Sequence, residues 1–231
     1  MTPDDQSRAQ DRPAMRTYGR VQSRSLKPRQ AALMQTLLPK LALPGGPLDP
    51  HALMPEATQV WLEAGFGAGE HLAAQAARHP HTLFLGAEPF VNGIAACLAH
   101  LDDAKLANVR LQHGDVRDVA ERLPDASVDR IYVLFPDPWP KTRHKKRRLI
   151  QPEFIAEAAR IMKPGAVLRF ATDWADYADW TLERFLAAPV FRWTAERADD
   201  WRAPWPDHVT TRYEAKRLGD CDPIWLEFER V

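Results

Sequence analysis

Alternating glycines stand where the first short apolar run of the chain gives way to an amphipathic segment. Gly65, Gly67 and Gly69 follow the run from Gln59 to Ala64 and precede the segment from Glu70 to Arg78. Glycines at such a point permit a tight turn and let a ligand approach the backbone closely. A purely structural turn between a strand and a helix is the alternative. The spacing differs from the G-x-G-x-x-G of dinucleotide-binding proteins and therefore predicts a ligand loop of another kind.

Acidic residues follow the next two apolar runs. Glu88 comes after residues 82–87, and Asp115 comes shortly after residues 109–113. An acid at the first point can accept both hydroxyls of a ribose, and a polar group at the second can meet an adenine edge. Either acid alone is also a good helix N-cap, which is the alternative reading. Their joint placement beside the glycines favours a ligand that contains a nucleoside.

A stiff loop follows the fourth apolar run. Three prolines in Phe135-Pro-Asp-Pro-Trp-Pro140 restrict the backbone and hold Asp137 and Trp139 in fixed directions. Because open α/β sheets bind ligands where their strands end, Asp137 is a candidate for the reacting site. Trp139 could stack on a base or pack as a hinge.

A run of cations continues from this loop. No acid interrupts it, and crowded like charges beside a ligand site favour a polyanionic partner, with phosphate as the natural counter-charge. A solvated charged face is the alternative. The members of this basic run are Lys141, Arg143, His144, Lys145, Lys146, Arg147 and Arg148.

Composition excludes several classes of protein. The 231 residues hold 31 basic and 31 acidic side chains, so attraction to a polyanion must come from a local patch. No apolar run approaches the roughly 20 residues of a membrane span. Two cysteines cannot build a disulfide framework or a cysteine zinc cluster, and no spacing of His, Cys and Asp predicts a metal site. We expect a cytoplasmic protein.

The elements that must position these residues alternate between strands and helices, which predicts a doubly wound, mostly parallel α/β sheet with helices on both faces. A last strand over residues 224–228 follows a segment rich in aromatic and charged residues. Strands are expected over residues 59–64, 82–87, 109–113, 128–135 and 166–172, and helices over residues 31–43, 70–78, 91–101, 116–122, 152–162 and 177–186.

The N-terminal part has a different character. Residues 1–29 are polar and carry seven basic against three acidic side chains. We expect a mobile basic tail there, either a nucleic-acid arm or a leader without a role, and one domain over residues 30–231.

Several segments together resemble bacterial tRNA (guanine-N7)-methyltransferases, from about Arg16 to the C-terminus. The proline–tryptophan loop with the basic run is the specific part of this resemblance. The matching segments are Phe135-Pro-Asp-Pro-Trp-Pro-Lys141, Arg143-His-Lys-Lys-Arg-Arg148, Leu62-Glu-Ala-Gly-Phe-Gly-Ala-Gly69, Gly86-Ala-Glu88, Ala171-Thr-Asp-Trp174, Thr211-Arg-Tyr-Glu214 and Arg217-Leu-Gly219.

The resemblance implies a class I methyltransferase (Rossmann-like) fold with an antiparallel final strand. It implies methyl transfer from S-adenosylmethionine to N7 of guanosine 46 in the variable loop of tRNA. It also implies no obligate protein partner, and the chain could be a monomer or a homodimer. Two features depart from the family pattern: Pro89 after Glu88, and the segment over residues 220–225 before the last strand.

The resemblance assigns roles residue by residue. Asp137 is the catalytic residue, and RNA contact falls on residues 143–148. Cofactor binding falls on Glu63, Gly65, Gly67, Gly69, Glu88, Asp115 and Asp137, and substrate binding on Lys141, Asp173, Thr211, Arg212, Tyr213 and Glu214.

The chemistry suits two of these acids. Guanine N7 carries a lone pair and no proton, so its methylation needs positioning and charge stabilisation rather than a strong base. We expect Asp137 and Asp173 to hold the purine and stabilise its developing charge. Asp173 could instead only cap a helix, and Thr211 with Glu214 matches a capping box.

Four other functions stay open at this point. A dehydrogenase using NAD would need the missing glycine spacing, and a methyltransferase for a small molecule would leave the basic run unexplained. A methyltransferase for another RNA fits the same residues. A non-catalytic RNA-binding module would ignore S-adenosylmethionine, so a titration with that compound would identify it.

Overall fold

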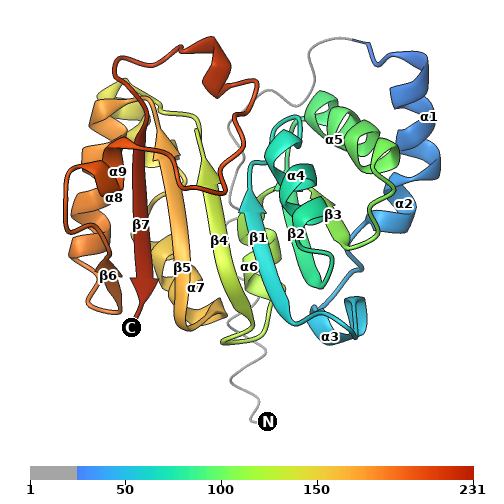
Figure 1. Cartoon of the computed structure of the whole chain (residues 1–231), viewed down its shortest axis with the longest axis horizontal. Helices are drawn as coiled ribbons and strands as arrows, with labels where there is room; N and C mark the ends of the chain where they lie inside the picture. Colours follow the sequence, from blue (N-terminus) through green and yellow to red (C-terminus); the bar gives the residue numbers. More distant parts are fainter. Residues whose placement is uncertain (1–24) are drawn as a thin grey trace.

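The computed structural model describes residues 25–231, so most of the predicted tail lies outside the described residues. Its centre is one sheet of seven strands in the order β3-β2-β1-β4-β5-β7-β6 (Figure 1). The strands are β1 (Gln59–Ala64), β2 (Thr82–Glu88), β3 (Val109–His113), β4 (Val128–Leu134), β5 (Met162–Thr172), β6 (Phe191–Trp193) and β7 (Ile224–Arg230).

The pairing of the strands confirms the predicted fold class. β1 to β5 pair in parallel, whereas β7 runs antiparallel to both β5 and β6. The strand order reverses between β1 and β4, which lie side by side in the sheet although three helices and two strands separate them in the chain. In open α/β sheets the crevice at such a reversal binds the ligand. The loops after β1, β2 and β4, where the predicted site residues stand, therefore meet at one edge.

Helices cover both faces of the sheet, and each face has its own core. On one side, residues of α1, α4 and α5 pack with Trp61 and Phe84. On the other side, residues of α6, α7 and α8 pack with Leu62 and Leu85. Successive strand residues point to opposite faces, which explains this division. The longer helices are α1 (Pro28–Thr36), α4 (Glu70–Arg78), α5 (Val91–Asp103), α6 (Val116–Arg122), α7 (Pro152–Ile161) and α8 (Ala175–Leu186).

The first helix differs from the prediction. A single helix was expected over residues 31–43, but the structure has α1 from Pro28 and a separate short α2 (Leu38–Leu41). Pro39 has no N–H to donate into the preceding turn, which accounts for the break. Proline suits the first turn, so Pro28 begins α1 earlier than the apolar spacing indicates. Arg29 then binds Asp102 at 2.8 Å on α5.

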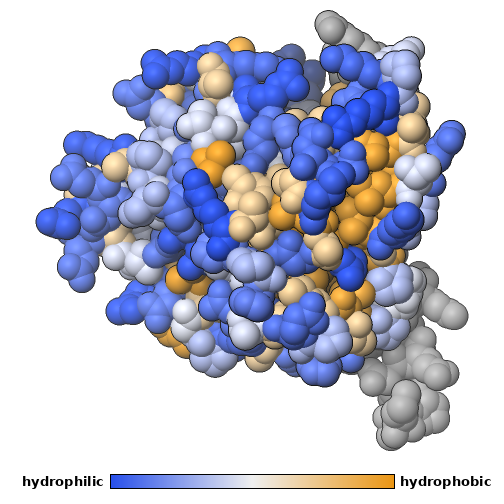
Figure 2. All heavy atoms as spheres, turned by 45° about the vertical axis from the view of Figure 1, so that its right-hand side comes forward, coloured by the Kyte–Doolittle hydropathy of each residue, from blue (hydrophilic) through white to orange (hydrophobic). Residues whose placement is uncertain are grey.

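The outer elements were not predicted. These elements carry too few residues for a periodic pattern: the short strand β6 and the short helices α3 (Pro50–Leu53), α9 (Asp199–Arg202), η1 (Thr142–Arg147) and η2 (Glu214–Lys216). Figure 2 looks toward the side of α1 and α5 and shows a mostly hydrophilic surface with several separate hydrophobic areas, the largest of them on the right. Over residues 25–231, no helix combines the length and the apolar character that crossing a membrane requires.

Glycines 65 and 69 offer a test of how tightly the loop after β1 is packed. Both have left-handed backbones, with φ of 69° and 81°. A Cβ on Gly65 would meet open space, whereas one on Gly69 would lie 2.6 Å from Cβ and 2.9 Å from Cα of Cys97. We expect Gly65→Ala to cost about 1 kcal/mol in strain alone. Gly69→Ala should cost about 3 kcal/mol, because α4 and α5 must also separate. Urea unfolding of both variants measures the difference, and equal losses would contradict the packing.

Candidate active site

The glycine loop between β1 and α4 is joined to the end of β2 by a carboxylate. Glu88 accepts hydrogen bonds from the backbone N–H of Gly67 at 2.8 Å and from that of Phe90, also at 2.8 Å. Gly67 has a φ of 57°, and added Cβ atoms at Gly65 or Gly67 would meet nothing within 4 Å. The loop is therefore shaped by Glu88 and leaves open space over its backbone, as a ligand loop requires.

Glu88 lies among other acids. Its side chain is buried, and burial raises the pKa of its carboxyl, with smaller contributions from the charges of Asp137 and Glu63. The two N–H groups oppose this rise in pKa. A cationic ligand would relieve the crowding of negative charge at this place.

Two of the other predicted cofactor residues have firm protein partners. Glu63 is buried near the end of β1 and accepts a hydrogen bond at 2.8 Å from Nδ1 of His71 on α4. Asp115 caps α6 by accepting from the backbone N–H of Arg117 at 3.0 Å, and it binds the Arg117 guanidinium as well. The capping alternative for Asp115 is thus what the structure shows, and its contact with adenine stays a prediction.

The proline-rich loop (residues 135–141) holds Asp137 between two strained residues. Phe135 has a φ of 49° and Trp139 a φ of 44°, a left-handed conformation that is rare outside glycine. The N–H of Phe135 donates to the carbonyl of Ala171 on β5 at 2.8 Å, which fixes the start of the loop. Strain of this kind gathers at functional sites, where the surrounding structure must hold it.

Asp137 itself is free of protein partners within residues 25–231. Its side chain reaches solvent, yet the surrounding protein displaces enough water to raise the pKa of its carboxyl. Its charge also contributes to the raised pKa values of Glu88 and Tyr213. A carboxylate that is crowded, acceptor-rich and unpaired is poised for a ligand that carries positive charge or N–H donors.

Arg148 holds the far end of this loop. Its Nε donates to the carbonyl of Pro138 at 2.8 Å, and one terminal nitrogen binds the carboxylate of Asp176 on α8 at 2.5 Å. The guanidinium also stacks on Tyr177 and Trp180, and the side chain is only 1% exposed. The donors of Arg148 are thus used inside the protein, and its contact with RNA stays a prediction.

The rest of the basic run is sorted by the 3₁₀ helix η1. Residues three apart share a face of such a helix. Lys145 lies on the face of Arg148 and binds Asp176 at 2.6 Å. His144 and Arg147 lie on the face that packs on Trp139. Arg143 and Lys146 form the third row, which is exposed to solvent. Lys141, which precedes the helix, is exposed as well.

Asp173 joins the end of β5 to the C-terminal segment. Its carboxylate accepts from the N–H of Gly219 at 2.8 Å, and its carbonyl accepts from the N–H groups of Asp220 and Cys221. Asp173 does not cap α8. Asp220 does so by accepting from the N–H of Ala175 at 2.9 Å, which explains part of the unusual segment over residues 220–225.

The predicted capping box over residues 211–214 is also present. The N–H of Glu214 donates to the hydroxyl of Thr211 at 3.2 Å, and the N–H of Thr211 donates to the carboxylate of Glu214 at 3.3 Å. The turn presents Tyr213, 46% exposed, whose pKa is raised by burial and by the charges of Asp137 and Asp173. Arg212 lies 4.0 Å from Glu70 on α4. The structure thus brings Glu88, Asp137, Asp173 and Tyr213 together.

A buried polar group behind this site was not predicted. His71 and Gln75 on α4 face His208 and Asp207 of the C-terminal segment. His71 and Gln75 are four residues apart and so share one helix face, a spacing that could have drawn attention to them. Nothing in the local sequence could have indicated their contact with residues more than 130 positions later.

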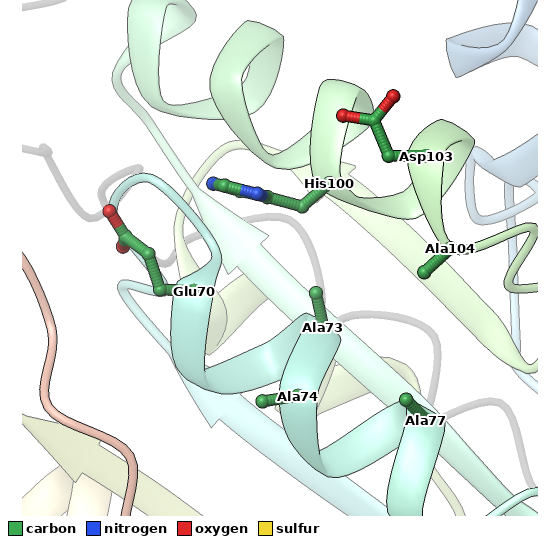
Figure 3. A pocket seen from close by; sticks show the side chains of 7 residues that line it. All are labelled: Glu70, Ala73, Ala74, Ala77, His100, Asp103 and Ala104. Carbon is green, nitrogen blue, oxygen red and sulfur yellow. The ribbon is translucent and has the colours of Figure 1, made fainter.

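A depression elsewhere on the surface has fewer polar groups that could bind a ligand. A shallow depression of about 480 Å³ lies between α4 and α5 (Figure 3). Alanines form most of its lining, with Glu70, His100 and Asp103 beside them, and no predicted site residue borders it. Across residues 25–231, no three His, Cys, Asp or Glu side chains gather as a metal ion would require.

Comparison with known proteins identifies the family. A family model described as a putative methyltransferase matches residues 57–225. The tRNA (guanine-N(7)-)-methyltransferase of Caulobacter vibrioides is 62% identical over 216 residues, covering 94% of this chain and 95% of that protein. The protein of the same name from Hyphomonas neptunium is 50% identical, covering 93% of this chain and 99% of its own length.

Solved structures agree on the fold. A 16S rRNA (adenine(1408)-N(1))-methyltransferase variant from Catenulisporales acidiphilia, solved with its cosubstrate SAM, superposes with a TM-score of 0.55. It is 21% identical and covers 80% of this chain and 92% of that one, a likeness that shows the shared class I methyltransferase fold. With the family model and the relatives of high identity, it leads to one conclusion: the chain belongs to the bacterial tRNA (guanine-N(7)-)-methyltransferase family.

Proposed function

We propose that the protein transfers the methyl group of S-adenosylmethionine to N7 of guanosine 46 in the variable loop of tRNA. The observation that carries this proposal is the placement of Asp137. Its unpaired carboxylate lies near Glu88 and Tyr213, between a ligand loop and a row of outward cations. Relatives named as tRNA (guanine-N(7)-)-methyltransferases support the choice of tRNA and of the guanine N7 atom.

The residues present fit S-adenosylmethionine. Open space above Gly65 and Gly67 leaves room for a ligand against the backbone, and the nearby acids suit its sulfonium and ammonium charges. Glu63, the glycine loop, Glu88, Asp115 and Asp137 would hold it. When bound, it supplies an electrophilic methyl group on a positively charged sulfur.

The residues of the protein then position the guanine and stabilise the positive charge that develops on it. The N7 lone pair forms the new bond to the methyl carbon while the carbon–sulfur bond breaks and its electron pair stays on sulfur. Guanine becomes positively charged, and carboxylates already in place near the purine favour that charge without reorganising. Asp137 can also accept from the N1–H and 2-amino donors of guanine, which orients N7 for attack. Asp173 can assist through the oxygen that Gly219 does not use.

Phosphate binding falls to the cations that face solvent. Lys141, Arg143 and Lys146 are exposed, whereas Lys145 and Arg148 are engaged with Asp176. Thr211, Arg212, Tyr213 and Glu214 would border the substrate. We further propose a cytoplasmic enzyme that needs no partner protein, with a basic N-terminal tail followed by one catalytic domain. The boundary expected between residues 29 and 30 moves to residues 27 and 28, because α1 begins at Pro28 and Arg29 binds Asp102.

Methyl transfer from labelled S-adenosylmethionine to bulk tRNA tests this function. Two pools should be compared, one with guanosine 46 and one with another base at that position, and the product mapped by cleavage at 7-methylguanosine. We expect transfer to the first pool only. Binding of S-adenosylmethionine without any transfer to tRNA would support a methyltransferase for another RNA.

Replacing the proposed catalytic carboxylate should separate activity from stability. We expect Asp137→Asn to lower kcat about 100-fold, because charge stabilisation at the purine is lost. The same variant should be more stable than the wild type near pH 7. The raised pKa of Asp137 means that its charged form is disfavoured in the fold, and the amide removes that penalty.

The sign of this effect can be checked by pH. Below the ordinary pKa of an aspartate, about 4, the carboxyl is protonated both folded and unfolded, so the stability advantage of the variant should vanish. Thermal unfolding of both proteins between about pH 3 and pH 8 measures this change in relative stability. An unchanged kcat would remove Asp137 from the mechanism, whatever the stability result.

The sorting of the basic run predicts unequal effects on tRNA binding. We expect the double variant Arg143→Gln/Lys146→Gln to weaken binding and to lower the slope of log affinity against log salt by about 1 to 2. Lys145→Gln is the matched control, because its ammonium is held by Asp176 and should leave the slope unchanged. Filter binding at several salt concentrations measures all three proteins. Equal slopes would place the tRNA backbone elsewhere.

A further inference from the structure

A buried chain of hydrogen bonds joins the cofactor side of the site to the substrate side. It begins at Glu63 on β1, continues through His71 and Gln75 on α4, and ends at the carbonyl of Asp207. The side chains of Glu63 and His71 are 5% and 2% exposed, and Gln75 is fully buried. Glu63 has a part in the proposed function, because it would help to hold S-adenosylmethionine, but His71 and Gln75 have none.

The direction of each hydrogen bond in this chain is fixed. The carbonyl of Asp207 can only accept, so Nε2 of Gln75 must donate to it at 2.6 Å. The second proton of the same nitrogen points to Nε2 of His71 at 3.3 Å, which must then be an unprotonated acceptor. The single proton of His71 is therefore on Nδ1, where it donates to the carboxylate of Glu63 at 2.8 Å.

No other protonation state satisfies the same contacts. A proton on Nε2 of His71 would face the Gln75 N–H groups, and turning the amide would set two acceptors against each other at Asp207. The Oε1 atom of Gln75 is buried without a partner in the described residues, so the amide already forgoes one hydrogen bond to keep this orientation. The orientation of the Gln75 amide is therefore set by the two ends of this chain of hydrogen bonds, Glu63 and the carbonyl of Asp207, rather than by Gln75 alone.

At its Asp207 end, the chain of hydrogen bonds lies next to the turn that carries Tyr213. The ring of His208 stacks on that of His71 with centroids 5.9 Å apart, and its Nε2 donates to Glu214 at 2.7 Å. Glu214 closes the capping box with Thr211. The segment over residues 207–214, named here the substrate segment, thus rests on α4 immediately behind the glycine loop.

We propose that Gln75 is a positioning residue that couples binding of S-adenosylmethionine to binding of tRNA, by joining Glu63 to the substrate segment. A ligand that contacts Glu63 fixes the imidazole of His71, which fixes the amide of Gln75 and hence Asp207. The coupling is reciprocal, because each ligand stabilises the same arrangement of one chain of hydrogen bonds. This inference rests on the proposed function.

The substrate segment has further anchors, so losing Gln75 should uncouple it without unfolding it. Arg78 donates to the same carbonyl of Asp207 at 2.7 Å. The carboxylate of Asp207 binds Arg169 at 2.8 Å and Arg130 at 3.4 Å. A Gln75→Met variant keeps the volume of the side chain and removes both N–H groups.

The test measures the affinity of tRNA without and with saturating S-adenosylhomocysteine, the demethylated and unreactive product. We expect the wild type to bind tRNA about 10-fold more tightly when this compound is present, the effect of one hydrogen bond of about 1.4 kcal/mol. In Gln75→Met the two affinities should agree within 2-fold, while the affinity for S-adenosylhomocysteine alone changes little. Gln151→Met is the matched control, because Gln151 donates to the carbonyl of Lys145 outside this chain and should keep the wild-type ratio.

Two results would overturn the proposal: a wild type in which the two tRNA affinities are equal, or a Gln75→Met variant with the wild-type ratio. If Gln75→Met does not fold, His208→Phe takes its place, because it preserves the ring contacts with His71 and Trp225 and removes only the bond to Glu214. It should likewise lower the ratio toward one, and a retained ratio would contradict the coupling. Failure of the proposed function looks different, since the wild type would then transfer no methyl group to tRNA.

Discussion

The buried guanidinium of Arg148 is the interaction on which the geometry of the site most depends. A buried charge is tolerated only when it is paired and its donors are satisfied. Here the pairing requires Asp176 from α8 and the carbonyl of Pro138 from the proline-rich loop. The contacts that satisfy Arg148 therefore join the proline-rich loop to α8. They also restrain the strained backbone on either side of Asp137. The position of that carboxylate follows from the arginine that ends the basic run.

The central fold could be predicted because its pattern is local. The bounds of β1, β3, α4 and α6 agree with those expected from apolar runs, prolines and glycines. The pieces that were missed, such as β6 and η1, are too short for a period to develop, and the break between α1 and α2 depends on a single proline. Where local preference and tertiary packing agree, sequence alone suffices; where packing decides, it does not.

The site divides in the same way. That Asp137, Glu88 and the glycine loop meet at one edge follows from parallel strands and could be argued from order along the chain. Whether a given cation faces solvent could not be predicted from the sequence, because composition records only that the run is basic. Arg148 and Lys146 are both cations of one run, yet one is buried under Trp180 and the other is exposed. The 3₁₀ periodicity that separates them appears only once the turn is seen.

The basic and acidic side chains of the protein are equal in number but separated in space, and this separation suits the proposed reaction. Acids gather around the glycine loop, where burial and mutual repulsion raise the pKa of Glu88, while exposed cations stand beyond the proline-rich loop. Methyl transfer moves one positive charge from sulfur to the purine and creates none. A fixed set of carboxylates can therefore serve both ends of the reaction without changing its own protonation, which is why the site needs rigid placement of its acids more than it needs a base.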